Sequence, residues 1–299
     1  FVIVRTDGTP VYNYIVSIDD ALMKITHVIR GEDHLSNTPK QLLVSRALGL
    51  QEPKYAHLAL VLGPDKAKLS KRHGITSVDQ YRKEGYLPEA LVNYIAMLGW
   101  ATESGEEILH FDKLIDLIEL KNLAKSAAVF DFKKLRWVNG QYIRNADLHQ
   151  IAQQFKPYIK DADFNLEAIS EDLYINIIEL IRGNCELLSD ISSLIGIFLN
   201  DVNIPDENTE KHLQEEDTKQ VIIIANEIFQ ETISDENIVD TLVQQVKEKA
   251  GFKGKKLFHP IRAILTGRLN GPDLKLAMPL IGFDRCKKRI EYCLKTFVS

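Results

Sequence analysis

Residues 57–74 read HLALVLGPDKAKLSKRHG, an apolar run followed by a Gly-Pro turn and a lysine-rich loop. The apolar run His57–Leu62 is short and predicts a strand, and the turn signal at 63–65 ends it. This stretch therefore places a basic loop directly after a strand.

The residues before this stretch add further β and helical segments. Residues 1–16 form two β-rich runs around the turn Asp7-Gly8-Thr9-Pro10, which predicts a hairpin. A third β-rich run, Ile25–Ile29, precedes the polar loop Arg30–Asn37 and a helix that Thr38-Pro39 opens and Gly49 ends. Strand, loop, helix, strand and loop in this order predict the later part of an α/β nucleotide-binding sheet. Because such a sheet normally has more strands ahead of this point, its first half is expected to be missing.

From about Thr76 the pattern predicts helices to the end of the chain. One amphipathic run opens at Pro88 and ends at Gly99, with apolar residues on one stripe: Leu87, Leu91, Tyr94, Ile95 and Leu98. Helical periodicity recurs at 111–123, 131–137, 148–158, 170–181, 219–229, 235–250, 259–266, 274–280 and 284–297. The polar stretch 200–217 predicts a linker or loop, and no internal repeat is visible.

Composition limits the class of protein. With 299 residues, of which 45% are hydrophobic and 26% charged, two domains are the starting expectation. No apolar run approaches the roughly 20 residues needed to cross a bilayer, so a cytosolic protein without membrane contact is expected. Cys185, Cys286 and Cys293 have no CxxC spacing, which favours reduced structural thiols over a disulfide or zinc site.

The charge is not that of a typical nucleic-acid protein. The net charge is −5, with 19 basic and 18 acidic residues in 1–150 against 18 and 24 in 151–299. Any contact with RNA must therefore come from local basic patches.

The lysine-rich loop is the segment most suited to chemistry. Lys68, Lys71 and Arg72 surround Ser70, which puts three cations and a hydroxyl on one short segment. Such a set suits a polyphosphate whose charge shifts during transfer. Lysine-rich loops are also common on surfaces, so a solvated basic loop is the alternative for this motif taken alone.

The wider sequence resembles one family. KLSKR resembles the KMSKS signature of class I aminoacyl-tRNA synthetases, in the variant form carried by glutamyl enzymes. ITHVIRGEDHLSNTPKQ and DGTPVYNY resemble segments around the amino-acid site of glutamyl-tRNA synthetases. EGYLPEALVNYIAMLGW, VFDFKKLRWVNGQYIR and HPIRAILTGRLNGPDL resemble further stretches of that family, so the resemblance spans nearly the whole chain in order.

This resemblance implies a fold and an activity. The fold would be the second half of a Rossmann-like class I catalytic domain at 1–75, a helical stem-contact domain at 76–145 and an all-helical anticodon-binding domain at 146–299. Glutamate would attack the α-phosphate of ATP to form an adenylate, and the terminal ribose of tRNA(Glu) would then take the acyl group. Mg²⁺ would arrive with ATP rather than in a cage of protein ligands, and a cytoplasmic monomer is expected.

The resemblance also assigns roles to residues. It assigns Lys71 to the ATP phosphates, and Lys68, Ser70 and Arg72 to the surrounding signature. Arg30 follows a predicted strand at its carboxyl edge, where α/β sheets bind ligands, and its guanidinium fits a carboxylate at two points. Arg30 is therefore expected to bind the glutamate side chain.

Three further residues are expected near the substrates. Tyr12 matches the family's TPVYNY position and can offer a hydroxyl, although a strand tyrosine that packs the sheet is an equal alternative. Glu32, Asp33 and His34 could suggest an acid/base or metal cluster, but neighbours on an extended segment point to opposite sides. The resemblance instead places Asp33 and His34 near the amino acid and the tRNA acceptor end, with no metal ligand among them.

One family signature is absent from the sequence. None of the eight histidines forms an HxGH-type pair, which should face ATP from the other side. The chain is thus expected to be a C-terminal part that is inactive alone.

RNA contacts are expected in the helical region. Trp100 and Trp137 are assigned to the core, whereas Lys133, Lys134, Arg136 and Arg144 could face phosphates. A basic patch at 247–268 is the best candidate for anticodon-arm contact, through Lys253, Lys255, Lys256 and Arg262, with Phe252 or Phe258 stacking on bases. A solvated basic face is the alternative.

Two questions stay open at the level of sequence. Glutamate-only enzymes tend to carry an arginine in the region resembling LIRGNCELL, where this chain has Asn184 with Arg182 nearby, so tRNA(Gln) is a second candidate substrate. An RNA-binding module without catalysis and a tRNA-base-modifying paralogue are the rival functions. The long helical C-terminal region argues against the paralogue.

Overall fold

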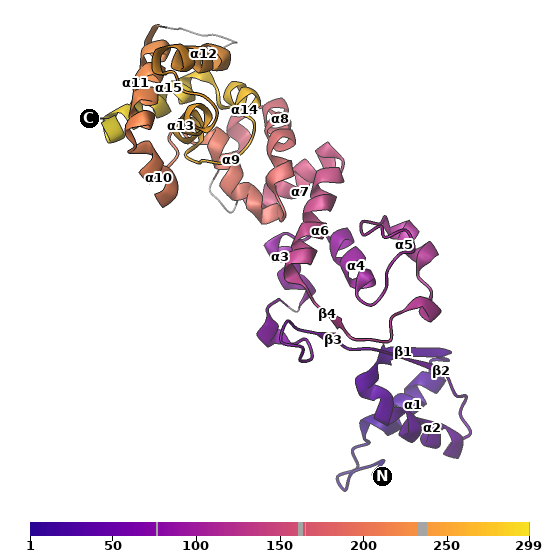
Figure 1. Ribbon diagram of the computed structural model, residues 1–299. Coiled ribbons are helices and arrows are strands. Elements are labelled where there is room, and N and C mark those ends of the chain that lie inside the picture. Colours follow the sequence, from indigo (N-terminus) through magenta and orange to yellow (C-terminus); the bar gives the residue numbers. More distant parts are fainter. Residues whose placement is uncertain (76, 161–163, 165, 232–237, 299) are drawn as a thin grey trace. The chain divides into compact units, whose positions relative to one another are not determined.

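The structure is a computed structural model that describes residues 1–75, 77–160, 164, 166–231 and 238–298; the side chains of Lys71, Lys160 and Ala168 also lie outside the description. The chain forms two compact units, Phe1–Gln80 with Pro88–Leu135, and Tyr81–Leu87 with Arg136–Ser299. Figure 1 shows the elements in chain order. The three domain boundaries expected from the sequence stay a prediction.

The chain begins with a turn and then a helix, so the predicted hairpin is wrong in its second half. A single antiparallel bridge joins Val4 to Pro10, but the β-rich run that follows is helix α1 (Tyr12–Leu22). The reason lies in packing against helix α2. Ser17 is buried and donates from Oγ to the Asn13 carbonyl (2.8 Å), while Gln41 donates to the Asn13 side chain (3.0 Å). Contacts spaced four residues apart override the β-propensity of tyrosine, isoleucine and valine.

A parallel β-α-β unit follows α1. Strand β1 (His27–Gly31) pairs in parallel with β2 (Lys54–Leu58), with Arg30 opposite His57. Between them run the 3-10 helix η1 (Glu32–Asn37) and helix α2 (Thr38–Ala47). Helix α2 opens and ends as predicted, since Pro39 lies in its first turn and Gly49 has a φ of +64°. The unit confirms the α/β character of this part.

The predicted strand His57–Leu62 is split in two. Its first residues belong to β2, and its last two form β3 (Val61–Leu62), which pairs in parallel with β4 (Ala128–Val129). The sequence pattern could not reveal this because β4 has only two residues and its partner lies far away in the chain.

The rest of the first unit is helical and surrounds a small core. Trp100 packs with Leu109 and Leu114 as predicted, whereas Ile95, expected on the apolar stripe, is 52% exposed. The helices of this part are α4 (Pro88–Met97), α5 (Phe111–Leu117) and the 3-10 turn η3 (Leu120–Asn122). The helix predicted at 111–123 thus ends early, at Leu117. Helix α3 (Val78–Glu84) begins in the first unit, and its residues from Tyr81 onward belong to the second.

The described residues of the second unit form helices joined by turns and loops, with no strand among them, as expected. Helices α11, α12, α13 and α15 pack together, and α14 contacts α8, α9 and α15 (Figure 1). The α-helices are α6 (Phe132–Asn145), α7 (Leu148–Lys160), α8 (Glu171–Ile181), α9 (Ile191–Leu199), α10 (Glu207–Leu213), α11 (Glu216–Glu231), α12 (Ile238–Ala250), α13 (Lys255–Thr266), α14 (Leu274–Ile281) and α15 (Phe283–Cys293). Short turns η4 (Leu166–Ala168), η5 (Arg182–Asn184), η6 (Leu188–Asp190) and η7 (Leu294–Val298) link or end them.

Two expectations for this unit are wrong. Trp137 is 39% exposed because the buried face of α6 is formed by its neighbours Leu135, Val138 and Asn139. The predicted linker 200–217 contains helix α10, since the Asp206 side chain accepts a bond from the Thr209 N–H (2.8 Å) and caps it.

The three cysteines lie in the interior, as expected of structural thiols. Cys185, Cys286 and Cys293 are free and buried, and burial raises the pKa of each thiol to about 12. Such thiols are structural rather than reactive. Within the described ranges, no helix combines the length and apolar character needed to cross a membrane.

Candidate active site and RNA-binding surface

Two segments singled out in the sequence meet beyond the carboxyl end of β1. Asp33 lies in η1, directly after β1, and Lys68 lies in the loop after β3. The Lys68 ammonium nitrogen is 2.6 Å from the Asp33 carboxylate, and this hydrogen bond lowers the pKa of Asp33. The basic loop and the Arg30–Asn37 segment therefore border the same space.

The Arg30 side chain, near the carboxyl end of β1, is held by neighbouring neutral side chains. Its Nη2 donates to Thr38 (3.0 Å) and to the Gln41 side chain (2.8 Å), and its guanidinium carbon lies 5.3 Å from the centre of the Tyr55 ring. Its Nε is buried and has no hydrogen-bond partner among the described groups. Because neutral groups orient the guanidinium and no described carboxylate pairs with it, Arg30 can accept an anionic ligand.

Tyr12 and His34 lie next to each other. Tyr12 starts α1 and is 51% exposed, and the centre of its ring is 5.9 Å from that of His34. The alternative of a strand tyrosine that packs the sheet is therefore wrong. The Tyr12 ring is exposed, whereas His34 is half-buried and its Nδ1 lies 3.4 Å from the Asn37 side-chain nitrogen.

The segment Glu32–His34 is not extended, contrary to the argument made from the sequence. It is part of the 3-10 helix η1, in which Glu32 accepts a bond from the Leu60 N–H (3.4 Å) and Asp33 pairs with Lys68. Among the residues described, no three His, Cys, Asp or Glu side chains are grouped as metal ligands.

The basic loop is ordered by backbone bonds at its base. Gly63 N–H donates to the Ala67 carbonyl (2.8 Å) and Leu69 N–H donates to the Val61 carbonyl (3.0 Å). Ser70 is extended and precedes the 3-10 turn η2 (Lys71–His73). Lys68 and Arg72 are exposed, and the Lys71 side chain lies outside the described part of the structure.

Several residues at this site were not identified from the sequence. Thr38 and Gln41 orient Arg30, and His73 contacts both Ser70 and Asp65. A serine followed three residues later by a side chain that can accept a bond is the capping-box pattern, which was the available signal for His73.

The basic patch of the second unit is partly neutralised. Lys256 pairs with Asp217 (2.7 Å) and Lys249 with Glu227 (2.8 Å), while Lys253 and Lys255 are exposed without a described ion pair. Of the cations expected to contact tRNA, two are therefore directly available.

Arg262 faces a small hollow beside this patch. The hollow measures about 420 Å³ and is lined by Lys255, Phe258, His259, Arg262 and residues 269–271. Arg262 donates to the Pro272 carbonyl, and burial lowers its pKa. Phe258 is 43% exposed, so a flat aromatic face and a held guanidinium border the same hollow.

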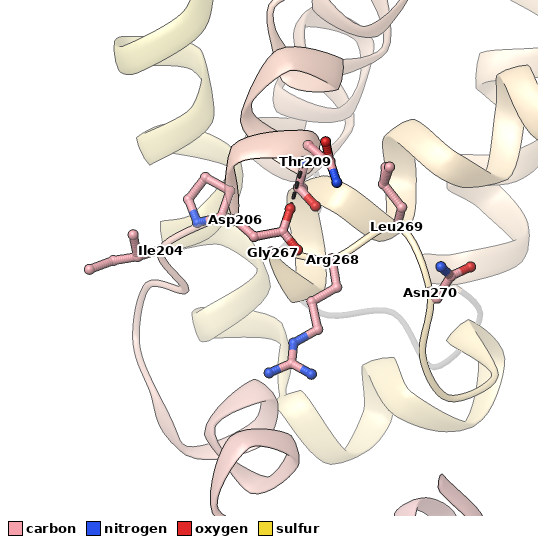
Figure 2. Close-up of a pocket in the computed structure, with 9 residues that line it drawn as sticks. Ile204, Asp206, Thr209, Gly267, Arg268, Leu269 and Asn270 are labelled. Carbon is pink, nitrogen blue, oxygen red and sulfur yellow. Dashed lines mark hydrogen bonds between the residues drawn. The ribbon is translucent and has the colours of Figure 1, made fainter. Parts of the chain in front are cut away.

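A larger hollow lies on another side of the 267–270 loop. Figure 2 shows it between Ile204, Asp206 and Thr209 on one side and Gly267–Asn270 on the other. The hollow has a volume of about 590 Å³. Arg268 donates to the Ser193 carbonyl (2.7 Å).

Two of the four α6 cations expected to face phosphates have a described ion pair, whereas Lys133 is exposed and Arg144 donates to the Gly183 carbonyl (3.3 Å). Lys134 binds Glu107 (2.5 Å), and Arg136 binds both Glu186 (2.7 Å) and Asp190 (2.9 Å). Arg136 therefore joins α6 to the segment 186–190 within the second unit.

Comparisons with known proteins agree with this arrangement. A family model described as the catalytic domain of class I tRNA synthetases (E and Q) matches residues 1–137, and a model of anticodon-binding domains matches residues 150–294. The glutamate-tRNA ligase of Desulforamulus reducens is 39% identical over 99% of this chain, and that of Heliobacterium modesticaldum is 42% identical over 97%. The chain belongs to the glutamate-tRNA ligase family.

A solved member of this family has the same fold. The crystal structure of a glutamate tRNA ligase from Elizabethkingia meningosepticum in complex with its amino acid matches 99% of this chain with a TM-score of 0.83 and 32% identity. The prediction of a class I catalytic part followed by a helical anticodon-binding region is confirmed. The chain spans 62% of the length of that structure and of the Desulforamulus ligase.

Proposed function

We propose that this chain is part of an enzyme that ligates glutamate to tRNA(Glu) through a glutamyl-adenylate made from ATP. The observation that supports it is the meeting of the Arg30–His34 segment with the Lys68–Arg72 loop through the 2.6 Å pair between Lys68 and Asp33. An anion-binding group and a polyphosphate-binding loop then lie on two sides of one space. A carboxylate must approach a phosphate there for the first step of the reaction.

Each group has a role in this proposal. The Arg30 guanidinium binds the side-chain carboxylate of glutamate, and Tyr12 and His34 contact the same substrate. Lys68, Ser70, Lys71 and Arg72 bind the phosphates of ATP and stabilise the charge that develops as pyrophosphate leaves. Mg²⁺ comes bound to ATP and neutralises part of that charge. Catalysis is thus positioning and electrostatic stabilisation, with no general base, because the amino-acid carboxylate is already ionised.

The second unit binds the tRNA in this proposal. Lys253, Lys255, Lys256 and Arg262 attract the phosphates of the anticodon arm, and Phe258 stacks on an unpaired base in the hollow beside Arg262. tRNA(Gln) is a second candidate substrate because Asn184 stands in the region where glutamate-only enzymes tend to have arginine. The enzyme is proposed to act as a cytoplasmic monomer.

Replacement of Lys71 tests the catalytic assignment. In the complete gene product, Lys71→Ala should lower the rate of glutamate-dependent ATP–pyrophosphate exchange with tRNA by about a hundredfold, because the charge is needed mainly in the transition state. Lys54→Ala, at the amino end of β2, is the matched control and should exchange at the wild-type rate. An unchanged exchange rate for Lys71→Ala would show that the assignment of this loop to the active site is wrong.

A further inference from the structure

The His73 side chain packs against the base of the basic loop and contacts Gly63, Asp65 and Ser70. Its ring packs on Gly63 so closely that a Cβ there would come within 2.8 Å of the ring carbon Cγ. Its Nδ1 is 3.0 Å from the Ser70 backbone nitrogen, and its Nε2 is 3.1 Å from the Asp65 carboxylate. The side chain is only 10% exposed, so these contacts take up nearly all of the ring.

The partners fix the tautomer of the ring. A backbone N–H can only donate, so Nδ1 must be the unprotonated acceptor for Ser70. Nε2 then carries the proton and donates it to Asp65. Asp65 also accepts the Ala67 N–H (2.9 Å), and the hydrogen bonds from Ala67 and His73 lower its pKa. His73 therefore acts as a neutral link between the two ends of the loop.

This link sets the backbone from which the predicted phosphate ligands extend. Ser70 is extended, with φ −147° and ψ 171°, and the chain then turns into η2. His73 N–H donates to the Ser70 carbonyl (2.9 Å), so Ser70 is bound on both of its backbone groups by one residue. Gly63 and Asp65 tie the same ring to the turn after β3. The loop can then present Ser70, Lys71 and Arg72 in one conformation instead of many.

We infer that His73 is a positioning residue of the active site, held by Asp65 and Gly63, that orders the loop for binding ATP phosphates. This inference rests on the proposed function for its chemical consequence. Its structural part, the ordering of the loop by the bond from Ser70 N–H to His73 Nδ1, stands on the contacts alone. His73 itself does not need to touch ATP.

Three substitutions separate the two bonds of the ring. His73→Asn places an amide oxygen near the position of Nδ1 and keeps the acceptor for Ser70, but loses the bond to Asp65. His73→Gln places an amide nitrogen near Nε2 and keeps the bond to Asp65, but loses the acceptor. His73→Phe keeps the ring and loses both bonds.

In the complete gene product, His73→Gln and His73→Phe should lower the exchange rate roughly tenfold to a hundredfold, with an unchanged KM for glutamate, since a misplaced loop affects mainly the transition state. His73→Asn should stay within about threefold of wild type, the effect of one lost hydrogen bond. Equal losses in all three variants, with a raised glutamate KM, would show a general structural role and overturn the inference.

Trypsin gives a readout that does not depend on activity. The loop contains Lys66, Lys68, Lys71 and Arg72, so cleavage there reports its order in the 299-residue chain. His73→Gln and His73→Phe should be cut in the loop several times faster than wild type, and His73→Asn at nearly the wild-type rate. Wild-type cleavage rates in all three variants would overturn the inference. If the wild-type gene product shows no exchange at all, the proposed function fails, while the order of cleavage rates still decides whether His73 orders the loop.

Discussion

At the scale of single residues, the site combines cations that are held with cations that are loosely paired. Arg30 is fixed by Thr38 and Gln41, which are neutral, whereas Lys68 is paired with the exposed carboxylate of Asp33. A pair in solvent contributes little and exchanges easily, so Lys68 can leave Asp33 when a phosphate arrives. Arg30 forms no direct ion pair with a described carboxylate, although its charge acts on Asp20, and Thr38 and Gln41 orient it before the substrate binds.

Arg30→Ala tests this difference. In the complete gene product it should weaken transition-state stabilisation with glutamate, measured from kcat/KM, by about 2–5 kcal/mol, the range for removing one partner of a desolvated charge pair. Arg46→Ala is the control, because Arg46 is exposed on α2 and its one described ion pair is with Glu52. A thermal melt of both variants checks that folding is intact. An Arg30→Ala enzyme with wild-type kcat and KM for glutamate would make Arg30 a structural residue.

Residue types were easier to predict from the sequence than partners. The cations of KLSKR and the arginine after β1 stand out because few side chains suit phosphates and carboxylates. Nothing in the sequence showed that Lys68 would meet Asp33, 35 positions away, since that contact depends on how the strands pair. The roles of all these residues remain predictions until tested by substitution.

At the scale of elements, caps and hydrophobic periodicity identified most helices, while strands depended on distant partners. Helix α8 begins directly after Ser170, whose side chain accepts a bond from the Leu173 N–H, and its predicted bounds were nearly right. Helix α1 was predicted as a strand because its residues favour β-structure, and only the contacts of Asn13 and Ser17 with α2 explain the helix. Local signals in the chain predict local structure, and packing decides the rest.

One buried side chain ties three elements of the second unit. Asn139, in α6, accepts the Leu87 N–H (2.7 Å) and donates to the Glu186 carbonyl (2.6 Å) and the Gly85 carbonyl (3.4 Å). Asn139→Ala would remove the partner of the buried Leu87 N–H and the bond to the Glu186 carbonyl, while the Gly85 carbonyl keeps its bond from the Leu188 N–H (2.9 Å). This loss should lower the free energy of unfolding by about 2–3 kcal/mol.

Urea unfolding followed by circular dichroism measures this loss. Asn145→Ala, at the exposed end of the same helix, controls for the change in side chain and should alter the free energy by less than about 0.5 kcal/mol. If both variants unfold at the same urea concentration, water must form hydrogen bonds with the backbone groups around Asn139. The hydrogen bonds of Asn139 would then add nothing to the free energy of unfolding.

At the scale of the whole molecule, chemistry and RNA binding are assigned to different units. Arg30, Asp33 and Lys68, which we propose to face the substrates, belong to the first unit, and the exposed lysines of the anticodon-binding region belong to the second. Each unit has its own buried core, so each can fold around its own contacts. Binding of tRNA and adenylate formation should therefore respond separately to substitutions.

This separation predicts what the 299-residue chain does alone. Its described residues supply a loop for phosphates and an arginine for glutamate, but no HxGH pair to face ATP from the other side. Since positioning provides most of the acceleration in such a reaction, we expect no detectable glutamylation by this chain. The basic surface of the second unit should still bind tRNA, weakly because Lys256 is already paired with Asp217.

Salt dependence identifies the source of that binding. Each phosphate contact contributes about 0.7 to the slope with which the logarithm of affinity falls against the logarithm of salt concentration. Affinity should therefore fall roughly 50-fold between about 50 and 200 mM salt if a phosphate is bound by each of Lys253, Lys255, Lys256 and Arg262. Replacing both Lys253 and Lys255 by alanine should lower the slope by about 1.4, whereas Lys295→Ala, an exposed lysine of η7, should leave it unchanged. A filter-binding titration beside a charging assay measures both quantities. Charging by this chain would mean that its own residues complete the active site, and salt-independent binding would move the tRNA contact away from these four cations.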